Sequence, residues 1–292
     1  MDTVETAQQF EIIPSGAALC AEVKVDDLRT IDDTTAKSIE QAWFEHSVLL
    51  FRNQTLSDQD LITFTKRFGE PDLPARSRIG QPWIPETPLL TCISNVMTDN
   101  GKRTGSLGDG EAVWHADLTF LDVPPSGSFL YSIEIPNEGG NTGFCSLYRA
   151  YETLPAALKN TIKDKILLHD HTHNSAGELR PNQSADLASP EDNPGARHPM
   201  VCTHPDSGRK TLFLGRRPHA YIIGMSQQDS DDLLDELWAH ATQKKFTWHH
   251  TWRVGDLLLW DNRCVLHRRD AFDPTARRIL HRSQLKGTKP QA

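Results

Sequence analysis

Short apolar segments, each followed by Gly, Pro, Asn or Asp, recur along this chain of 292 residues. Few classes of fold are built from segments of this kind. Segments 48–51, 128–135 and 257–260 have the length and apolar composition of buried strands. Segments with helical periodicity are fewer and lie before and between them. Many short strands with a few helices are typical of an antiparallel barrel or sandwich that carries helices outside. The sequence therefore predicts a mainly β fold with flanking helices.

The same patterns assign most of the chain to particular elements. We expect helices where apolar residues recur every three or four positions, at 33–46, 57–68, 146–154, 155–162 and 226–241. Ser57 and Ser226, each followed three residues later by Asp, should cap two of them. We expect one or two edge strands within 11–31 and further strands at 48–51, 89–96, 128–135, 142–145, 166–173, 199–203, 210–214, 246–252, 257–260 and 277–285.

The length suits a single large domain, which we expect to span residues 1–292. Two long irregular stretches interrupt the pattern of strands and helices. Residues 97–112 are rich in Gly, and residues 174–197 are polar with three prolines and two glycines. Loops of this length inside a compact domain usually have a functional role. We predict that both loops cover an active site, with partial disorder as the alternative for residues 174–197.

The composition argues against several kinds of partner. The formal net charge is −8, and no basic run or basic helix face stands out, so we expect neither a nucleic-acid nor a membrane partner. No apolar stretch approaches the roughly 20 residues that cross a bilayer. Residues 1–10 are polar and acidic, unlike a signal peptide. Five scattered cysteines without a C-x-x-C pair suit a reducing compartment, and we expect a cytoplasmic protein.

The stretch 114–117 (WHAD) carries a candidate metal site. On an extended segment, His115 and Asp117 point to the same face and can bind one ion. An imidazole and a carboxylate suit Fe(II), and three such ligands on one face leave the other face open for chemistry. One such pair is weak evidence, because His204-Pro205-Asp206 has the same spacing. That second pair runs into Ser-Gly, and we expect a turn with its side chains at the surface.

A third ligand and two cations follow near the end of the chain. His267 comes after an apolar strand and a turn, and we expect it at a strand end, facing inward. Arg278 lies 11 residues after His267, and Arg282 lies four residues further on. On a strand these two arginines share a face. Two guanidiniums beside a metal indicate that organic anions bind there.

These motifs together resemble the TauD/TfdA family, the taurine dioxygenase and 2,4-dichlorophenoxyacetate dioxygenase group of non-haem Fe(II), 2-oxoglutarate-dependent enzymes. The resemblance covers nearly the whole chain. It implies a double-stranded β-helix, or jelly-roll, core. It rests on segments 114–120, 139–142, 254–256 and 260–263, and on His267, Arg278 and Arg282.

The resemblance also implies a role for each site residue. His115, Asp117 and His267 would bind Fe(II), which leaves positions for the cosubstrates 2-oxoglutarate and O2. Thr142 and Arg278 would hold 2-oxoglutarate, with Trp260 at the border of its pocket. Arg282 would hold the anionic end of the substrate, and Asn95 and Arg216 would lie near the substrate.

The expected reaction is hydroxylation of a small anionic organic molecule, with 2-oxoglutarate converted to succinate and CO2. The substrate would be an aryloxyalkanoate, a sulfonate or another carboxylate, and cleavage of a bond to a neighbouring heteroatom would follow where one is present. Segments 93–96, 215–216 and 219–220 are similar to those of aryloxyalkanoate-cleaving members, but Arg217 stands where close members have His. We also expect a homo-oligomer.

Two other functions are compatible with the same residues. One is a non-catalytic jelly-roll protein that binds a metal or an anion as a sensor, and the other is a zinc enzyme on the same scaffold. Three further histidines, His169, His171 and His173, alternate on a predicted strand and offer a second metal site. They have no carboxylate or cysteine at a fixed spacing, so we expect partly buried or loop-facing histidines instead. His249 and His250 are adjacent and should point to opposite faces.

Overall fold

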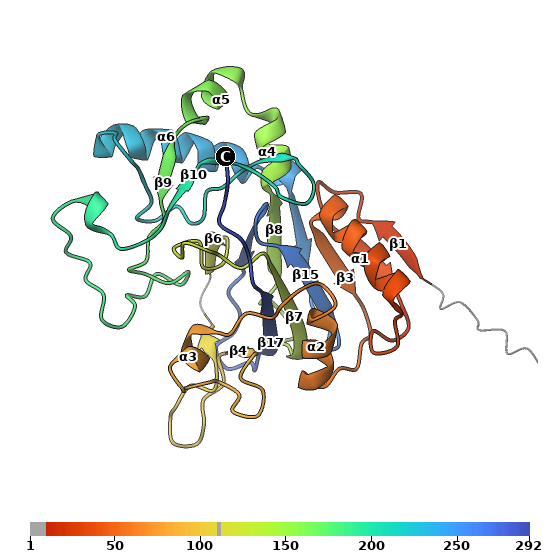
Figure 1. Cartoon of the computed structure of the whole chain (residues 1–292). Coiled ribbons are helices and arrows are strands. Elements are labelled where there is room, and N and C mark those ends of the chain that lie inside the picture. The colour runs from red at the N-terminus through yellow and green to blue at the C-terminus, as the bar shows by residue number, and fades with distance from the viewer. Residues whose placement is uncertain (1–9, 110–111) are drawn as a thin grey trace, which may run out of the picture.

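The computed structural model describes residues 10–109 and 112–292, and these residues form a mainly β structure with helices outside two large sheets (Figure 1). The larger sheet has eight strands in the order β1 (Glu11–Pro14), β2 (Ala21–Lys24), β3 (Val48–Phe51), β15 (Leu257–Asp261), β7 (Gly127–Glu134), β17 (Ile279–Leu285), β4 (Thr91–Ser94) and β5 (Ser106–Leu107). Only the pairs β2–β3 and β4–β5 are parallel.

The smaller sheet has four antiparallel strands in the order β14 (Thr247–His250), β8 (Thr142–Ser146), β16 (Val265–Arg269) and β6 (Ala112–His115). Two minor sheets are β10 (Arg197–Pro199), β9 (Ile166–Leu168) and β13 (Tyr221–Ile222), and β11 (Val201–Thr203) with β12 (Lys210–Leu212). The helices are α1 (Asp33–His46), α2 (Asp58–Thr65), α3 (Ala75–Arg78), α4 (Leu147–Thr153), α5 (Ala156–Ile162), α6 (Gln227–Ala241), and the 3₁₀ turns η1 (Pro190–Asp192) and η2 (Lys244–Phe246).

The apolar residues of strand β15 do not alternate with polar ones, and the packing of the strand gives the reason. Leu257 and Leu259 point to the outer face of the larger sheet, where they pack in one cluster with Ile39 and Trp43 of α1. Leu258 and Trp260 point inward and pack against residues of the smaller sheet. Both faces of the strand are therefore buried, and burial on both faces requires a continuous apolar sequence.

The two large sheets pack face to face, and the smaller one is covered on its other side by helices. The cluster between the sheets joins Phe144 of β8 and Val265 of β16 to Trp260, Leu130 and Leu280 of the larger sheet. The outer face of the smaller sheet packs on α4 and α6 through residues that include Cys145, Leu147, Leu233, Leu237 and Leu266. The space between the sheets is where inward-pointing polar residues meet.

Most predicted elements are confirmed, although several bounds differ, and the differences that concern the site are the following. The second helix ends at Thr65 rather than near Phe68. The extended pattern predicted over 166–173 is a strand only over Ile166–Leu168. The last strand begins at Ile279, so Arg278 precedes it, and a β-bulge lies between Ile279 and Leu280. His267 lies in the middle of β16 and not at a strand end.

Three expectations concern the ends and loops of the chain. Residues 1–9, on which the signal-peptide prediction depends, and residues 110 and 111 of the first loop lie outside the described residues. None of the described helices is long and apolar enough to cross a membrane. Loop 174–197 follows a defined path, with a capped 3₁₀ turn at Pro190–Asp192 and the strand β10 at its end.

Candidate metal centre and substrate pocket

The two halves of the predicted metal site meet across neighbouring strands. His115 is the last residue of β6, and His267 lies directly opposite it on β16. The ring centroids of the two histidines are 4.1 Å apart. Asp117 follows β6 by two residues, and its Oδ1 lies 3.9 Å from the Nε2 atom of each histidine. Sheet pairing therefore brings together ligands that are far apart in the sequence.

The geometry of these three residues fits a metal ion. Donor atoms of His115, Asp117 and His267 lie within 4.8 Å of one another, and all three residues are buried. Two donors that bind one ion at about 2.0–2.2 Å lie about 3–4 Å apart. The Nδ1–H of His115 donates to the carbonyl of Val113 at 2.7 Å, which leaves Nε2 for the metal. Two histidines and one carboxylate on one face are the ligand set of non-haem Fe(II) oxygenases.

Electrostatics keep the ligands in their metal-binding protonation states. Burial, and next the neighbouring His115, lower the pKa of His267 to about 3, so its imidazole is neutral. Burial raises the pKa of Asp117, but its polar and charged neighbours, Arg282 above all, outweigh it and hold the pKa at about 2. The site therefore offers two neutral imidazoles and one carboxylate at neutral pH.

Side chains of the larger sheet orient Asp117. Arg282 Nη1 donates to Oδ1 at 2.9 Å and to Oδ2 at 3.0 Å. Gln284 Nε2 and Ser128 Oγ each donate to Oδ2 at 3.2 Å. Gln284 lies two residues after Arg282 on β17, so both point to the same face. The sequence analysis missed Gln284 and Ser128, although that spacing was a usable signal for Gln284.

Asn262 fixes the main chain of the same ligand. Its Oδ1 accepts from the Asp117 N–H at 2.7 Å, and its Nδ2 donates to the Asp117 carbonyl at 2.9 Å and the Pro125 carbonyl at 3.0 Å. The next residue, Leu118, has a φ of 52°, a left-handed conformation that a Leu adopts only when its surroundings impose it. Asn262 lies in a segment used for the family resemblance, but the sequence analysis treated it only as part of a turn.

Arg278 has the surroundings expected of an anchor for a buried anion. Its side chain is 2% exposed, and no carboxylate among the described residues lies within ion-pair distance. Its Nε donates to the Gly140 carbonyl at 3.2 Å. Gly140 has a φ of 61°, and a Cβ there would lie 3.1 Å from the Arg278 side chain, so glycine is favoured at this position. Burial, and next Arg269, lower the pKa of Arg278 to about 9. A bound anion would offset this cost.

The other predicted cosubstrate residues lie between the sheets. Thr142 begins β8, and its Oγ1 accepts a hydrogen bond from Trp252 Nε1 at 3.0 Å. Trp260 is buried with its ring centroid 4.8 Å from that of His267. Trp260 is therefore next to the candidate ligand His267, and Thr142 lies on β8, which pairs with the strand β16 that carries His267.

Asn95 contacts the chain just before β17 and does not line the main cavity. Its Nδ2 donates to the Ala276 carbonyl at 2.8 Å, and its Oδ1 accepts from the Arg278 N–H at 3.0 Å. Asn95 thus positions Arg278. Its substrate contact stays a prediction.

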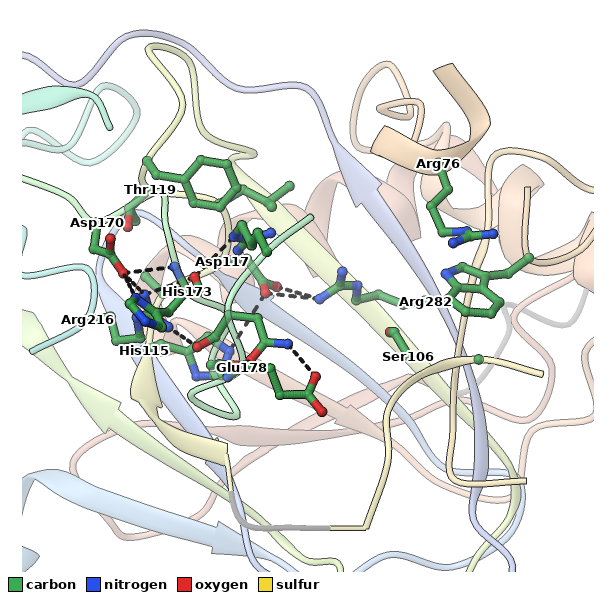
Figure 2. Close-up of a pocket in the computed structure, with 18 of the residues that line it drawn as sticks. Arg76, Ser106, His115, Asp117, Thr119, Asp170, His173, Glu178, Arg216 and Arg282 are labelled. Carbon is green, nitrogen blue, oxygen red and sulfur yellow. Dashed lines mark hydrogen bonds and ion pairs between the residues drawn. The ribbon is translucent and has the colours of Figure 1, made fainter. Parts of the chain in front are cut away.

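A cavity of about 430 Å³ opens beside the metal ligands (Figure 2). Its size is within the range of small-molecule sites. Both predicted loops contribute to its walls, and the residues that line it are Arg76, Trp83, Arg103, Gly105, Ser106, His115, Ala116, Asp117, Leu118, Thr119, Phe120, Asp170, His173, Asn174, Ser175, Glu178, Arg180, Arg216 and Arg282.

Arg216 lies in this cavity, but its guanidinium is already bound. It pairs with the buried carboxylate of Asp170 and donates to the carbonyls of His173 and Asn174. In Figure 2 these residues form one group at the side of the cavity away from Arg282. Arg216 therefore anchors the start of loop 174–197, and its contact with substrate stays a prediction.

Of two expectations about other histidines, one is wrong in part and the other is confirmed. The surface turn predicted for His204-Pro205-Asp206 is wrong for His204, which is 2% exposed and lies 2.8 Å from Asp261. Asp261 is distant in the sequence, so the local turn pattern could not reveal this partner. His250 is buried and His249 is exposed, as adjacent strand residues should be.

The strand predicted to carry His169, His171 and His173 is absent, because β9 ends at Leu168. Their rings contact different neighbours: His169 packs on His198, His171 stacks on Phe120, and His173 stacks on His219. Within residues 10–109 and 112–292 these histidines form no metal-binding group. This arrangement agrees with the alternative prediction, that these are buried or partly buried histidines without a metal.

Two facing sheets with a His, Asp, His ligand set between them define a non-haem iron oxygenase. Residues 11–284 match the family described as "Taurine catabolism dioxygenase TauD, TfdA family". This chain belongs to that family, and it is an Fe(II)- and 2-oxoglutarate-dependent dioxygenase that uses O2.

Curated relatives and solved structures are similar over nearly the whole chain. The (S)-phenoxypropionate/alpha-ketoglutarate-dioxygenase of Sphingobium herbicidovorans is 32% identical and covers 95% of each chain. The alpha-ketoglutarate-dependent 2,4-dichlorophenoxyacetate dioxygenase of Cupriavidus pinatubonensis is 33% identical, over 92% of this chain and 95% of the relative. The structure of AAD-2 in complex with Mn(II) and N-oxalylglycine has a TM-score of 0.78 at 28% identity, over 97% of this chain and 100% of that chain.

Proposed function

We propose that this enzyme hydroxylates a small organic acid, with an aryloxyalkanoate as the first candidate and a sulfonate, a sulfate ester or another carboxylate as alternatives. The observation that carries the proposal is the guanidinium of Arg282 beside the metal ligand Asp117 in a cavity of about 430 Å³. The names of the relatives, which act on phenoxypropionate and dichlorophenoxyacetate, support the same substrate class.

The proposed roles divide the site into three parts. His115, Asp117 and His267 hold Fe(II), which when bound couples decarboxylation of 2-oxoglutarate by O2 to hydroxylation of the substrate. Arg278 and Thr142 hold 2-oxoglutarate, and the inward ring of Trp260 excludes water beside it. Where the hydroxylated carbon bears an ether oxygen, the product collapses to a carbonyl compound and an alcohol, which breaks the carbon–oxygen bond.

The protein supplies positioning for this reaction more than acid–base chemistry. Bidentate pairing of a guanidinium with a carboxylate or sulfonate fixes the direction of the substrate as well as its charge. Arg282 donates through Nη1 to Asp117, and a substrate anion at its other nitrogens would lie next to the metal. A fixed geometry of this kind lowers the entropy cost of the reaction.

The same proposal includes the finer architecture. We infer that the two facing sheets form a jelly-roll core within one domain over residues 1–292, and that loops 97–112 and 174–197 cover the site. Residues from both loops line the cavity, which supports this role. The cytoplasmic location and the homo-oligomer expected from the sequence stay predictions.

Succinate formation tests the function directly. The wild-type protein is incubated with Fe(II), 2-oxoglutarate, ascorbate and O2, and 2,4-dichlorophenoxyacetate, (S)-2-phenoxypropionate, taurine and an alkyl sulfate are compared. We expect at least one acid to raise succinate formation above the rate without substrate. The His115→Ala variant should lose this activity and keep its fold, because within its sheet the His115 side chain makes one hydrogen bond, to Val113, and one ring contact, with His267. An active His115→Ala variant, or no response to any acid, would contradict the proposal.

A further inference from the structure

The cavity is lined by more arginines than the proposed roles account for. Its walls carry five arginines: Arg76, Arg103, Arg180, Arg216 and Arg282. Three of them have carboxylate partners, in the pairs Arg282–Asp117, Arg216–Asp170 and Arg103–Glu178. For Arg76 and Arg180, no carboxylate in the described part of the chain lies within ion-pair distance.

These two arginines differ in their surroundings. Arg76 is exposed, lies over the ring of Trp83 at 4.2 Å and donates to the Gln81 carbonyl, so water can solvate its charge. Arg180 belongs to loop 174–197 and is partly buried. A cation withdrawn from water costs free energy unless an anion or other acceptors compensate it. Arg180 therefore needs an anionic partner more than Arg76 does.

Contacts with His173 and Phe120 hold the side chain of Arg180 in place. Its Nε donates to the His173 carbonyl at 3.0 Å, and its guanidinium carbon lies 4.3 Å from the ring centroid of Phe120. The ring of Phe120 stacks in turn on His171, with centroids 4.6 Å apart and planes at 16°. These contacts use Nε and leave the two terminal nitrogens of Arg180 without a hydrogen-bond partner among the described residues.

The neighbouring carboxylate of Asp170 does not supply the missing partner. Asp170 accepts hydrogen bonds from the main chain and hydroxyl of Thr172, from Asn193 and from Arg216. With these donors its carboxylate is fully used, and Arg216 adds a second positive charge beside Arg180. Burial, and next Arg216, lower the pKa of Arg180. Asp170 acts in the opposite direction and raises this pKa, but no carboxylate of the described residues forms an ion pair with Arg180. The wall of the cavity thus presents a preorganised cation that can accept an anionic partner.

We propose that Arg180 binds an anionic group of the substrate and is a specificity-determining residue of this enzyme. The inference rests on the proposed function, and it adds Arg180 as a second contact with the anionic part of the substrate, beside the Arg282 contact of that proposal. A carboxylate or sulfonate would pair with the two terminal nitrogens of Arg180, on the wall formed by loop 174–197. The enzyme would then select acids over their neutral derivatives through a contact in loop 174–197, outside the strands β6 and β16 that carry His115 and His267.

Binding to the holoenzyme tests this assignment. Under anaerobic conditions, the protein with Fe(II) and 2-oxoglutarate is titrated with 2,4-dichlorophenoxyacetate and (S)-2-phenoxypropionate, and with the neutral amide of each. We expect the wild type to bind the acids more tightly. Arg180→Gln should weaken acid binding about 10- to 100-fold, the usual size for a hydrogen-bonded charge, and leave amide binding unchanged. Arg180→Lys should recover part of the affinity.

A matched control separates this contact from a structural role. Arg197→Gln changes an exposed arginine near the end of the same loop, whose side chain donates to the carbonyls of Gly195 and Glu191. It should bind both acids and amides as the wild type does. If Arg180→Gln weakens the acid and the amide equally, lowers the melting temperature, or raises the KM for 2-oxoglutarate, Arg180 only supports the loop and the inference is wrong.

The two proposals fail in different ways. If no acid stimulates succinate formation by the wild type, the proposed function is wrong. If the acids stimulate it and Arg180→Gln keeps the wild-type affinity and KM for them, the proposed function stands and only the role of Arg180 is wrong. A wild type that binds amides as tightly as acids also contradicts the role of Arg180.

Discussion

Asp117 depends on more side chains than either of the other two ligands. Arg282, Gln284 and Ser128 bind its carboxylate, and Asn262 binds its main chain. A ligand with this many supports has one orientation before the metal arrives. The free energy of metal binding is then not used to order the carboxylate.

Removal of one support should weaken the metal site without unfolding the protein. Gln284→Leu keeps the volume of the side chain and deletes its donors to Asp117 and Ser128. Loss of such a partner typically lowers metal affinity or activity about 10- to 100-fold. Anaerobic titration with Fe(II) measures the affinity, with Gln291→Leu near the exposed C-terminus as the control. An unchanged affinity in Gln284→Leu would show that Arg282 and Ser128 suffice.

Two glycines offer a matched test of close packing beside the pocket. Gly215 has a φ of 62°, and an added Cβ would lie 2.1 Å from His169 Nδ1 and 2.7 Å from Thr119 Oγ1. Gly208 has a φ of 68° with no atom within 4 Å of the added Cβ. Gly208→Ala should cost about 1–2 kcal/mol through backbone strain. Gly215→Ala should cost roughly 1–3 kcal/mol more through the steric clash. Urea denaturation compares them, and equal losses would contradict the packing argument.

At the residue scale the sequence predicted that His115, Asp117 and His267 come together, as the structure shows, but it did not predict the residues around them. His115 and Asp117 are recognisable because two positions on one strand necessarily share a face, and the family resemblance adds His267. Asn262 lies in the predicted turn, but its contact with Asp117 was not predicted, and neither was the burial of His204 against Asp261, because these partners are distant in the sequence. Local patterns contain no information on such partners.

At the scale of elements, the two loops of the cavity are joined directly. Arg103 of the first loop lies 3.4 Å from Glu178 of the second, with side chains 51% and 50% exposed. The main chain adds a hydrogen bond of 3.2 Å from the Val113 N–H to the Ser175 carbonyl. The ion pair is too exposed to add much stability, but it holds one loop against the other.

Glu178→Gln should therefore loosen the loops more than the fold. We expect the free energy of unfolding to change by less than about 1 kcal/mol, as for other exposed pairs. Proteolytic cleavage within loop 174–197 should become faster, since fewer contacts oppose its local opening. Limited proteolysis and urea denaturation measure the two effects. Glu191→Gln, an exposed residue of the same loop, is the control, and equal cleavage rates would argue against a role for the ion pair.

Elements whose signals are local were predicted well. Helix α1 and strand β3 have the predicted bounds, because a capping Asp32 and a continuous apolar run specify them without help from the rest of the chain. The extended pattern over 166–173 failed because β9 is stabilised by β10 and β13, which reach only as far as Leu168. Pairing with distant strands decides where a short strand ends.

At the scale of the whole molecule, the buried group of His204, Asp261 and Arg263 links stability to pH. Burial raises the pKa of Asp261, but Arg263 and His204 outweigh it and hold the pKa well below its usual range. Such a carboxyl stabilises the fold above its unfolded pKa, about 3.9. This stabilisation is lost as the pH falls toward the lower folded pKa.

We therefore expect the free energy of unfolding to fall steeply as the pH drops below about 4. Asp261→Asn should flatten this slope and cost about 3 kcal/mol at pH 7, because Arg263 loses its bidentate partner and keeps only Asp206. Urea denaturation from pH 3 to pH 7 measures both. Asp164→Asn, at an exposed site, is the control, and a slope that Asp261→Asn leaves unchanged would assign the pH dependence to other carboxyls.

The order of strands in the two sheets was beyond the sequence patterns, because it depends on contacts between segments such as β7, β15 and β17 that lie far apart. That order places β17 between β7 and β4 in the larger sheet. In the proposed roles, Arg278 immediately before this strand would bind the cosubstrate and Arg282 on it would bind the substrate, while Gln284 donates to Asp117. Variation along β17 would disturb all three at once. If the proposed roles hold, exchange of residues in loops 97–112 and 174–197 would change which substrate binds and leave the strands beside the metal site intact.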